Sequence, residues 1–309
     1  MDERRLHRPD AESMPLPAGL VERWSGPGAT EGERRWLDGL RHQAADLLEA
    51  WALRLDGAPY DSSAGWVAPV RTADGLEAVA KIGLPHEDAA YEVDALRAFD
   101  GKGAVRVLRS SDDGWSMLLE RCQPGTPVVE LPVGEGIAVA ATVLRELWRA
   151  VPAGSPFRSL RDIALRWSAE LPAVVAGEGY DTDTIAAGMA AARQLAESQP
   201  AAVLLHGDLN PYNVVSAQRR PWLAIDCKPV VGDPAYDTAQ YLGNLTDMAF
   251  DSRDPLATMA GFADGFARPL SLDPARVMGW AFVKSLGWTW APPAVELFRR
   301  GWETRRDVL

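Results

Sequence analysis

Residues 204–215 read Leu204-Leu205-His206-Gly207-Asp208-Leu209-Asn210-Pro211-Tyr212-Asn213-Val214-Val215. Apolar residues enclose a polar loop in this stretch, a pattern that predicts two short strands joined by a loop of functional residues. A second stretch, Trp222-Leu223-Ala224-Ile225-Asp226, predicts another strand that ends in a carboxylate. Asp208 and Asn213 are five positions apart, and Asp226 follows thirteen positions after Asn213. This spacing is expected where a base, an amide metal ligand and a carboxylate metal ligand converge.

These three polar residues have the chemistry that phosphoryl transfer demands. An ionised Asp208 only accepts hydrogen bonds, so it can orient and finally deprotonate an attacking hydroxyl group. The amide of Asn213 and the carboxylate of Asp226 supply the hard oxygen ligands that Mg²⁺ prefers as it bridges the phosphates of ATP. In the alternative interpretation His206 braces the loop, Asp208 caps a turn and Asn213 binds local backbone. That interpretation leaves their joint spacing unexplained.

The first part of the chain mixes one helical pattern with several strand patterns. Residues 36–51 carry Trp and Leu at helical spacing and predict an amphipathic helix. Strands are predicted at residues 66–70, 76–82, 104–108 and 115–120. The first two flank Asp74-Gly75, and this pair supplies the positive φ that a tight hairpin turn needs. The sequence therefore predicts a small sheet that contains a hairpin.

Lys81 lies near the end of the second hairpin strand and faces away from the apolar row of that strand. A helix is predicted from residue 87 to residue 99, and Glu92 within it offers a carboxylate to pair with Lys81. A lysine on a hairpin is more often a solvated charge. The polar loop downstream favours the functional interpretation, in which Lys81 contacts the α- and β-phosphates and Glu92 fixes its direction.

The second part of the chain is dominated by helical periodicity. Helices are predicted at residues 137–151, 159–176 and 182–198, and again from residue 255 onward. Pro124-Gly125 breaks regular structure between the two parts and predicts a hinge. We therefore expect an α+β chain with a small β-rich part over residues 1–121, including an N-terminal helical extension, and a larger, mostly helical part over residues 122–309.

Composition limits the classes of function. The chain has 309 residues, 47% hydrophobic content and a net charge of −11. A chain of this kind can bury a core, and its acidity opposes nucleic-acid binding and favours a cationic small molecule, although such charge also serves solubility. Two cysteines are too few for a disulfide framework. No apolar run is long enough to cross a bilayer and the N-terminus is polar, so we expect a cytoplasmic protein with no membrane contact and no implied protein partner.

Three motifs together resemble those of aminoglycoside phosphotransferases. They are residues 206–213, Ile225-Asp226-Cys227-Lys228-Pro229 and Gly232-Asp233-Pro234-Ala235-Tyr236-Asp237. The nearest branch is that of streptomycin 6-kinases, which includes hydroxyurea phosphotransferases, and the resemblance extends from about residue 51 to the C-terminus. It implies a bilobal protein-kinase-like fold that uses ATP and Mg²⁺.

The resemblance also implies a role for each matching residue. Asp208 is then the catalytic base, Asn213 and Asp226 bind magnesium, and Lys81 binds phosphate with Glu92 as its partner. Backbone groups from Glu120 to Cys122 are implied to contact adenine. The chain departs from protein kinases where it lacks a full G-x-G-x-x-G motif, so phosphate cover is expected from Ser62, Ser63 and nearby backbone N–H groups.

Substrate residues are less marked in the sequence. Asp233 and Asp237 lie in a Gly-Asp-Pro turn, where capping and loop bracing are the ordinary roles, and Asp237 is also a candidate substrate contact. Glu296 is a second candidate, because the resembled family builds its acceptor pocket in this terminal region. Trp288 and Trp290 neighbour it, whereas the other tryptophans fit core packing.

The sequence thus predicts a kinase that phosphorylates a hydroxyl group of a small cationic molecule, such as streptomycin or a related aminoglycoside. One alternative keeps this chemistry and changes the acceptor to another antibiotic, a sugar, a choline-like alcohol or hydroxyurea. Another alternative is a nucleotide-binding pseudokinase that acts as a sensor. The presence of Lys81, Asp208, Asn213 and Asp226 together disfavours the sensor.

Overall fold

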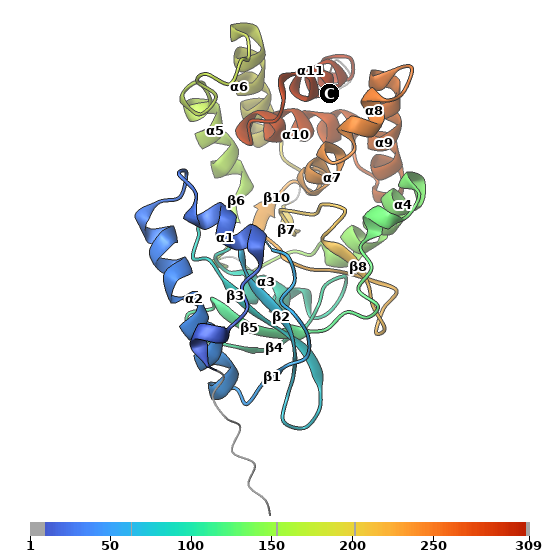
Figure 1. Ribbon diagram of the computed structural model, residues 1–309. Helices are drawn as coiled ribbons and strands as arrows, with labels where there is room; N and C mark the ends of the chain where they lie inside the picture. Colours follow the sequence, from blue (N-terminus) through green and yellow to red (C-terminus); the bar gives the residue numbers. More distant parts are fainter. Residues whose placement is uncertain (1–9, 63, 153, 201, 307–309) are drawn as a thin grey trace, which may run out of the picture. The chain divides into compact units, whose positions relative to one another are not determined.

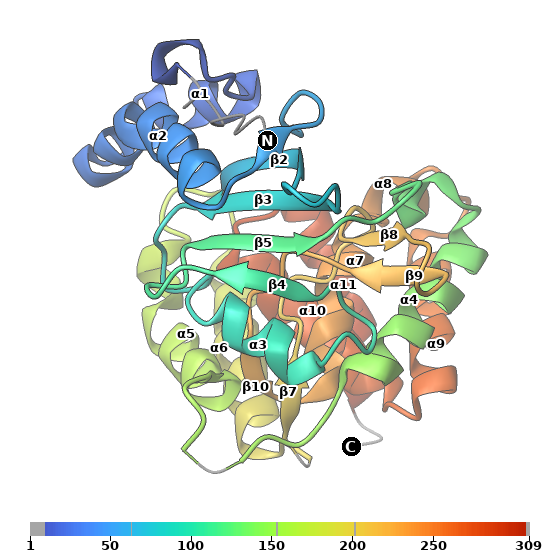
Figure 2. The same cartoon turned by 90° about the horizontal axis from the view of Figure 1, so that it is seen from below.

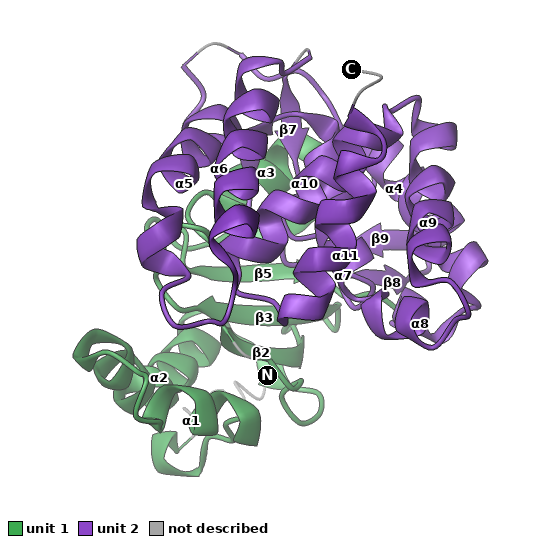
Figure 3. Ribbon diagram, turned by 90° about the horizontal axis from the view of Figure 1, so that it is seen from above, with its two compact units in different colours: residues 1–101, 105–123 green, residues 102–104, 124–309 purple. Residues whose placement is uncertain are grey.

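The structure of the protein is a computed structural model that describes residues 10–62, 64–152, 154–200 and 202–306 (Figure 1). The chain forms two compact units, shown in different colours in Figure 3. Unit 1 comprises residues 1–101 and 105–123, and unit 2 comprises residues 102–104 and 124–309. Among the described residues, no helix is both long and apolar enough to span a bilayer.

Unit 1 is built on an antiparallel sheet. Its strands run in the order β1 (Arg54–Leu55), β2 (Gly65–Arg71), β3 (Glu77–Gly83), β5 (Ser116–Glu120) and β4 (Val107–Ser110). Its helical elements are η1 (Ala11–Ser13), α1 (Ala18–Ser25), α2 (Glu31–Ala50) and α3 (Glu92–Phe99). In Figure 2, α2 and α3 lie on different sides of this sheet.

The predicted hairpin and the predicted first helix are confirmed. Strands β2 and β3 pair as expected, and Gly75 in the turn between them has a φ of 91°. Helix α2 begins at a capping box, in which Thr30 and Glu33 satisfy each other's backbone N–H groups. One apolar stripe of α2, including Leu40, packs in the same core as Trp66 and Ala80 of the sheet.

Two predicted boundaries in unit 1 are wrong. The helix expected from residue 87 begins at Glu92, because Tyr91 has a left-handed φ of 67°, which interrupts a helical path. The strand expected at residues 104–108 begins at Val107. Ala104 instead forms an isolated bridge with Ala224 within unit 2.

Unit 2 consists mostly of helices. These are α4 (Val133–Leu147), α5 (Leu160–Val174), α6 (Thr182–Glu197), α7 (Ala239–Gly243), α8 (Thr246–Phe250), α9 (Pro255–Leu270), α10 (Pro274–Gly287) and α11 (Pro292–Glu303), with the short 3₁₀ helices η2 (Val128–Glu130) and η3 (Pro234–Thr238). The helices predicted at residues 137–151, 159–176 and 182–198 are confirmed, with shifted ends. Helix α10 is the central one, since it is buried on all sides among α6, α7, α9 and α11.

Two small sheets of unit 2 carry the polar loop of residues 206–213. One has the order β6 (Arg158–Ser159), β10 (Val230–Gly232) and β7 (Val203–Leu205), and the other pairs β8 (Val214–Ser216) with β9 (Trp222–Ala224). The loop therefore leaves one sheet at Leu205 and enters the other at Val214. The strand predicted to reach Asp226 ends at Ala224, and Asp226 has a left-handed φ of 58°.

Candidate active site

The first predicted pair, Lys81 and Glu92, is formed within unit 1. The Lys81 ammonium nitrogen lies 2.7 Å from each of the two carboxylate oxygens of Glu92. Strand β3 buries Ala80 and Ile82 in the core shared with α2, so Lys81 between them points to the opposite side of the sheet. Only 9% of the Lys81 side chain and 4% of the Glu92 side chain are exposed, so solvent screens the pair weakly.

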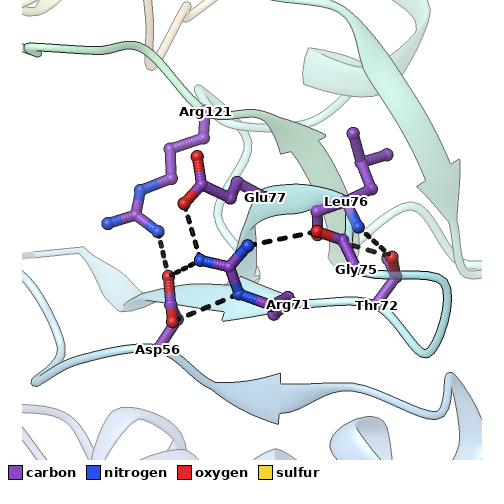
Figure 4. Close-up of polar contacts among 7 residues, drawn as sticks. All are labelled: Asp56, Arg71, Thr72, Gly75, Leu76, Glu77 and Arg121. Carbon is purple, nitrogen blue, oxygen red and sulfur yellow. Dashed lines mark hydrogen bonds and ion pairs between the residues drawn. The ribbon is translucent and has the colours of Figure 1, made fainter.

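The segment predicted to contact adenine is tied to the same sheet. Arg121 donates to Asp56, and Arg71 at the end of β2 bonds both Asp56 and Glu77, as Figure 4 shows. Hydrogen bonds from Arg121 and then Arg71 lower the pKa of Asp56. Glu120 donates its N–H to the carbonyl oxygen of Arg106, the residue before β4, and its carboxylate accepts from the N–H of Arg106 at 3.0 Å. These bonds therefore hold Glu120 and Arg121 against the sheet of unit 1.

The predicted phosphate-cover residues are only partly described. Ser62 is half-buried and lines a shallow pocket of unit 1 with Gly19, Glu22, Arg23 and Asp61. Ser63 lies outside the described residues. Cys122 is half-buried, whereas Cys227 is fully buried, and neither forms a disulfide bond.

Within unit 2, the polar loop holds Asp208 and Asn213 together. The side-chain nitrogen of Asn213 donates to the carbonyl oxygen of Asp208 at 3.0 Å. The Oδ1 atom of Asn210 accepts from the N–H of Tyr212 at 2.9 Å and from that of Asn213 at 3.2 Å. The loop is thus closed on itself by two asparagine side chains, a role that suits residues that readily bond nearby backbone.

Asn213 and Asp226 lie at neighbouring positions of the β8–β9 unit. The N–H of Ile225 donates to the carbonyl oxygen of Asn213 at 2.9 Å, and Asp226 is the next residue. The Lys228 ammonium lies 3.1 Å from an Asp226 carboxylate oxygen, so this carboxylate already attracts a cation. One carboxylate and one amide oxygen fit Mg²⁺, which binds few protein ligands and keeps its waters and the substrate phosphates. Among the described residues, no cluster of three or more His, Cys, Asp or Glu could hold a metal.

His206 braces the loop as a neutral imidazole. Its Nε2 lies 2.9 Å from the carbonyl oxygen of Ile225, which only accepts, so Nε2 carries the proton. Its Nδ1 then accepts from the N–H of Asp208 at 3.3 Å. Burial lowers the pKa of His206 to about 4, which agrees with this neutral tautomer.

Asp237 braces the same loop from η3. Its carboxylate accepts from the N–H groups of His206 and Gly207, at 3.0 and 2.7 Å, and from the indole N–H of Trp148 at 2.9 Å. Burial raises the pKa of Asp237, and these hydrogen bonds and the nearby Lys284 oppose that rise. Asp237 is 1% exposed and braces the loop, and its contact with a substrate stays a prediction.

The other residues of the substrate region have structural partners. Asp233 caps η3 as expected, and it also bonds Arg276 and Trp280. Glu296 on α11 forms an ion pair with Arg299 at 2.7 Å. Trp288 is 46% exposed. None of these placements tests the predicted contacts of Glu296 with an acceptor, which stay a prediction.

Lys284 on α10 is a further residue of the site, which the sequence motifs did not indicate. Its Nζ donates to the carbonyl oxygen of Gly207 at 3.0 Å, and its side chain is buried. The signal in the sequence was the run Val277 to Leu286, in which Lys284 is the single charged residue among apolar and small residues. A charge in a helix that is apolar all round needs a buried partner.

Comparison with known proteins identifies the family. The aminoglycoside/hydroxyurea antibiotic resistance kinase family matches residues 50–291. Streptomycin 6-kinase of Streptomyces griseus is 32% identical over 279 residues, which cover 89% of this chain and 90% of that protein. Hydroxyurea phosphotransferase of Kitasatospora aureofaciens is 37% identical over 234 residues, which cover 74% of this chain and 68% of that protein.

Solved structures show the fold at lower identity. Choline kinase from Cryptosporidium parvum superposes with a TM-score of 0.55 at 14% identity, over 84% of this chain and 90% of that one. An aminoglycoside phosphotransferase solved with AMP-PNP and hygromycin B gives a TM-score of 0.54 at 16% identity, over 82% of this chain and 96% of that one. The predicted protein-kinase-like fold is therefore confirmed. The chain belongs to the family of aminoglycoside/hydroxyurea antibiotic resistance kinases, which are small-molecule phosphotransferases.

Proposed function

We propose that this protein is an ATP- and Mg²⁺-dependent O-phosphotransferase that phosphorylates a hydroxyl group of a small cationic molecule, most specifically an aminoglycoside such as streptomycin. The observation that carries the proposal is the braced loop of unit 2. It presents Asp208 beside Asn213, and it sets Asn213 next to the Ile225-Asp226 step. Phosphoryl transfer depends on such fixed positions more than on covalent chemistry by the protein.

In this proposal Asp208 accepts the proton of the attacking hydroxyl. Its carboxylate orients that hydroxyl first. The proton moves to a carboxylate oxygen as the new O–P bond forms and the bond between the γ-phosphorus and the β,γ-bridging oxygen breaks, which releases ADP. His206 serves in a different capacity, because its burial and its bond to Ile225 keep it neutral. Asn213 and Asp226 would hold Mg²⁺, which supplies positive charge to the phosphate oxygens when bound.

Unit 1 contributes the phosphate-binding lysine in the same proposal. The Glu92 carboxylate holds the Lys81 ammonium at 2.7 Å and so sets its direction. The ammonium acts on phosphate as a compact charge with several donors. Backbone groups of residues 120–122 would bind adenine, and Ser62 with Ser63 would cover the phosphates. A cytoplasmic location suits an enzyme that depends on ATP.

The acceptor assignment rests on the relatives and on charge. Streptomycin 6-kinases of two Streptomyces species align over 88–89% of the chain, and the net charge of −11 favours a cationic acceptor. Hydroxyurea is the second candidate, because the hydroxyurea phosphotransferase is the relative with 37% identity. Acidic residues would attract the cationic streptomycin, whereas they would not attract the uncharged hydroxyurea.

The decisive measurement is Mg²⁺-dependent ATP consumption against an acceptor panel of streptomycin, other aminoglycosides, choline, sugars and hydroxyurea. Wild-type protein and Asp208→Asn are compared, and each product is identified by mass. We expect a gain of one phosphate on streptomycin, and a loss of at least about 10³-fold in turnover in the variant. Turnover with hydroxyurea alone would move the assignment to that acceptor. If ATP binds to the wild-type protein and no acceptor is phosphorylated, the protein is a sensor and the proposal fails.

A further inference from the structure

Lys284 is a buried charge to which the proposed chemistry gives no task. Its side chain is 1% exposed within α10. The Nζ atom donates to the carbonyl oxygen of Gly207 at 3.0 Å, and it lies 4.7 Å from the ring centre of Tyr236 and 5.3 Å from that of Trp288. A carbonyl oxygen and two aromatic faces are all partners that an ammonium prefers.

The carbonyl that Lys284 holds belongs to the peptide bond that leads into Asp208. The N–H at the other edge of that peptide is the Asp208 N–H, which donates to His206 Nδ1 at 3.3 Å. A trans peptide is planar, and its C=O and N–H point in opposite directions. Holding both edges therefore fixes the orientation of the whole plane, and with it the direction in which the Asp208 side chain leaves the backbone.

The preceding peptide is held in the same way. The carbonyl oxygen of His206 accepts from the N–H of Lys228 at 2.8 Å, and the N–H of Gly207 donates to Asp237 at 2.7 Å. Gly207 needs this external support, because it has a φ of 80° and no side chain to restrict it. A buried carboxylate thus holds one side of the Gly207 backbone and a buried ammonium holds the other.

The geometry points to Lys284 as a positioning residue for phosphoryl transfer. Its ammonium holds the peptide plane between Gly207 and Asp208, so that the Asp208 carboxylate meets the acceptor hydroxyl at the required angle. This inference rests on the proposed function for its catalytic consequence. Its structural part, the restraint of the loop by Lys284, stands on the hydrogen bonds alone.

A second buried cation on α10 provides the matched control. Arg276 is 8% exposed, and its guanidinium bonds Asp233 at 2.7 Å and the carbonyl oxygen of Leu195 at 3.1 Å. Like Lys284, it is a buried cation of α10 that donates to a backbone carbonyl oxygen. Its recorded partners, however, lie outside residues 206–208. A purely structural role for Lys284 predicts the same consequences for both side chains.

The test compares Lys284→Met and Lys284→Gln with Arg276→Lys in the full chain. Met keeps the bulk of the side chain, and the shorter, polar Gln provides a second variant if the Met protein does not fold. For each protein, kcat, KM for ATP, melting temperature and amide hydrogen exchange across residues 204–213 are measured. We expect both Lys284 variants to lose about 10- to 100-fold in kcat, with KM for ATP changed less than about twofold, since a displaced base impairs chemistry more than binding.

Exchange at the Gly207 and Asp208 amides should accelerate in the Lys284 variants. In Arg276→Lys the melting temperature should fall while kcat and loop exchange stay within about twofold of wild type. Lys284 variants that only melt earlier, with kcat and loop exchange like those of Arg276→Lys, would overturn the inference. If the wild-type protein transfers phosphate to no acceptor, the proposed function fails instead. Amide hydrogen exchange at Gly207 and Asp208 then still tests whether Lys284 restrains the loop. Faster exchange in the Lys284 variants supports this restraint, and unchanged exchange refutes it.

Discussion

The ammonium nitrogen of Lys81 lies 2.7 Å from both carboxylate oxygens of Glu92, and both side chains are almost fully buried. A pair in such surroundings differs from a surface ion pair. Removing one partner from a buried pair takes away the charge that compensated the other, which typically costs about 3–5 kcal/mol. The same contact fixes the Lys81 side chain in one direction. The pair should therefore matter both for the stability of the protein and for its use of ATP.

Glu92→Gln should destabilise the protein by about 3 kcal/mol and lower kcat/KM for ATP by about 10²-fold, because Lys81 loses the charge that orients it. Denaturant unfolding and steady-state kinetics measure the two effects. Glu146→Gln is the control, since Glu146 pairs with Arg220 at 3.1 Å, away from the proposed ATP contacts, and the two side chains are 36% and 40% exposed. A partly exposed pair contributes less than about 1 kcal/mol. Equal losses in the two variants would contradict the special role of Glu92.

Gly207 should resist substitution for two separable reasons. Its φ is 80°, which costs a residue with a side chain about 1–2 kcal/mol, and a Cβ there would lie 1.9 Å from the carbonyl oxygen of Lys228. Gly114 has a φ of 76° and no atom within 4 Å of such a Cβ. Denaturant unfolding should show a loss of about 1 kcal/mol in Gly114→Ala and several-fold more in Gly207→Ala, because a backbone atom must move in the latter. Similar losses of unfolding free energy in Gly207→Ala and Gly114→Ala would show that the loop can move away from the added Cβ with little loss of stability.

The parts of the fold that were predictable are those encoded locally. Asp74-Gly75 requires a tight turn, and the apolar residues around it alternate, so β2 and β3 followed from neighbouring residues. The polar loop of residues 206–213 was also predictable, because its polar groups form hydrogen bonds to one another within a few positions of the chain. Short-range chemistry leaves a pattern in the sequence.

Long-range contacts left little or no such pattern. Asp237 was expected to cap or brace a loop, and the structure shows which groups it braces, the N–H groups of His206 and Gly207. Nothing in the turn sequence indicates that partner, because the contact exists only once η3 packs beside the loop. Lys284 was detectable as the single charge of the apolar run 277–286, but the carbonyl group that it contacts was not. The left-handed backbone conformation of Tyr91 was not predictable either, and it makes α3 shorter than the predicted helix.

His206 should make the stability of the protein depend on pH. Burial lowers its folded pKa to about 4, below the ordinary value near 6.5. Between these values the unfolded chain binds a proton that the folded protein excludes, so stability rises with pH through this window and falls on acidification. From pH 7.5 to pH 5 this contribution should fall by about 2 kcal/mol. The raised pKa of Asp237 acts in the opposite sense, since folding raises its pKa and lowers that of His206.

A difference measurement isolates the histidine. The free energy of unfolding is measured for the wild type and His206→Gln at pH 7.5 and pH 5, and the gap between them should narrow by about 2 kcal/mol at the lower pH. Asp237 is present in both proteins, so its contribution cancels. His42→Gln on the exposed face of α2 is the control, because folding does not bury its ring. A gap that stays constant for His206→Gln would mean that the ring titrates alike in both states.

Asp226→Asn should weaken the dependence on Mg²⁺ without unfolding the protein. The variant keeps an oxygen ligand but loses the negative charge, so we expect the half-saturating Mg²⁺ concentration to rise and kcat to fall on the order of 10²-fold. Asp183→Asn, at an exposed position in the first turn of α6, changes the net charge equally and should leave both values unaltered. A titration of turnover against Mg²⁺ at fixed ATP measures the effect. If Asp226→Asn and Asp183→Asn give the same Mg²⁺ dependence, Asp226 is not a metal ligand.

Lys228→Met should shift the same titration toward lower Mg²⁺. The Lys228 ammonium lies 3.1 Å from an Asp226 carboxylate oxygen, so the substitution removes a cation that competes with Mg²⁺.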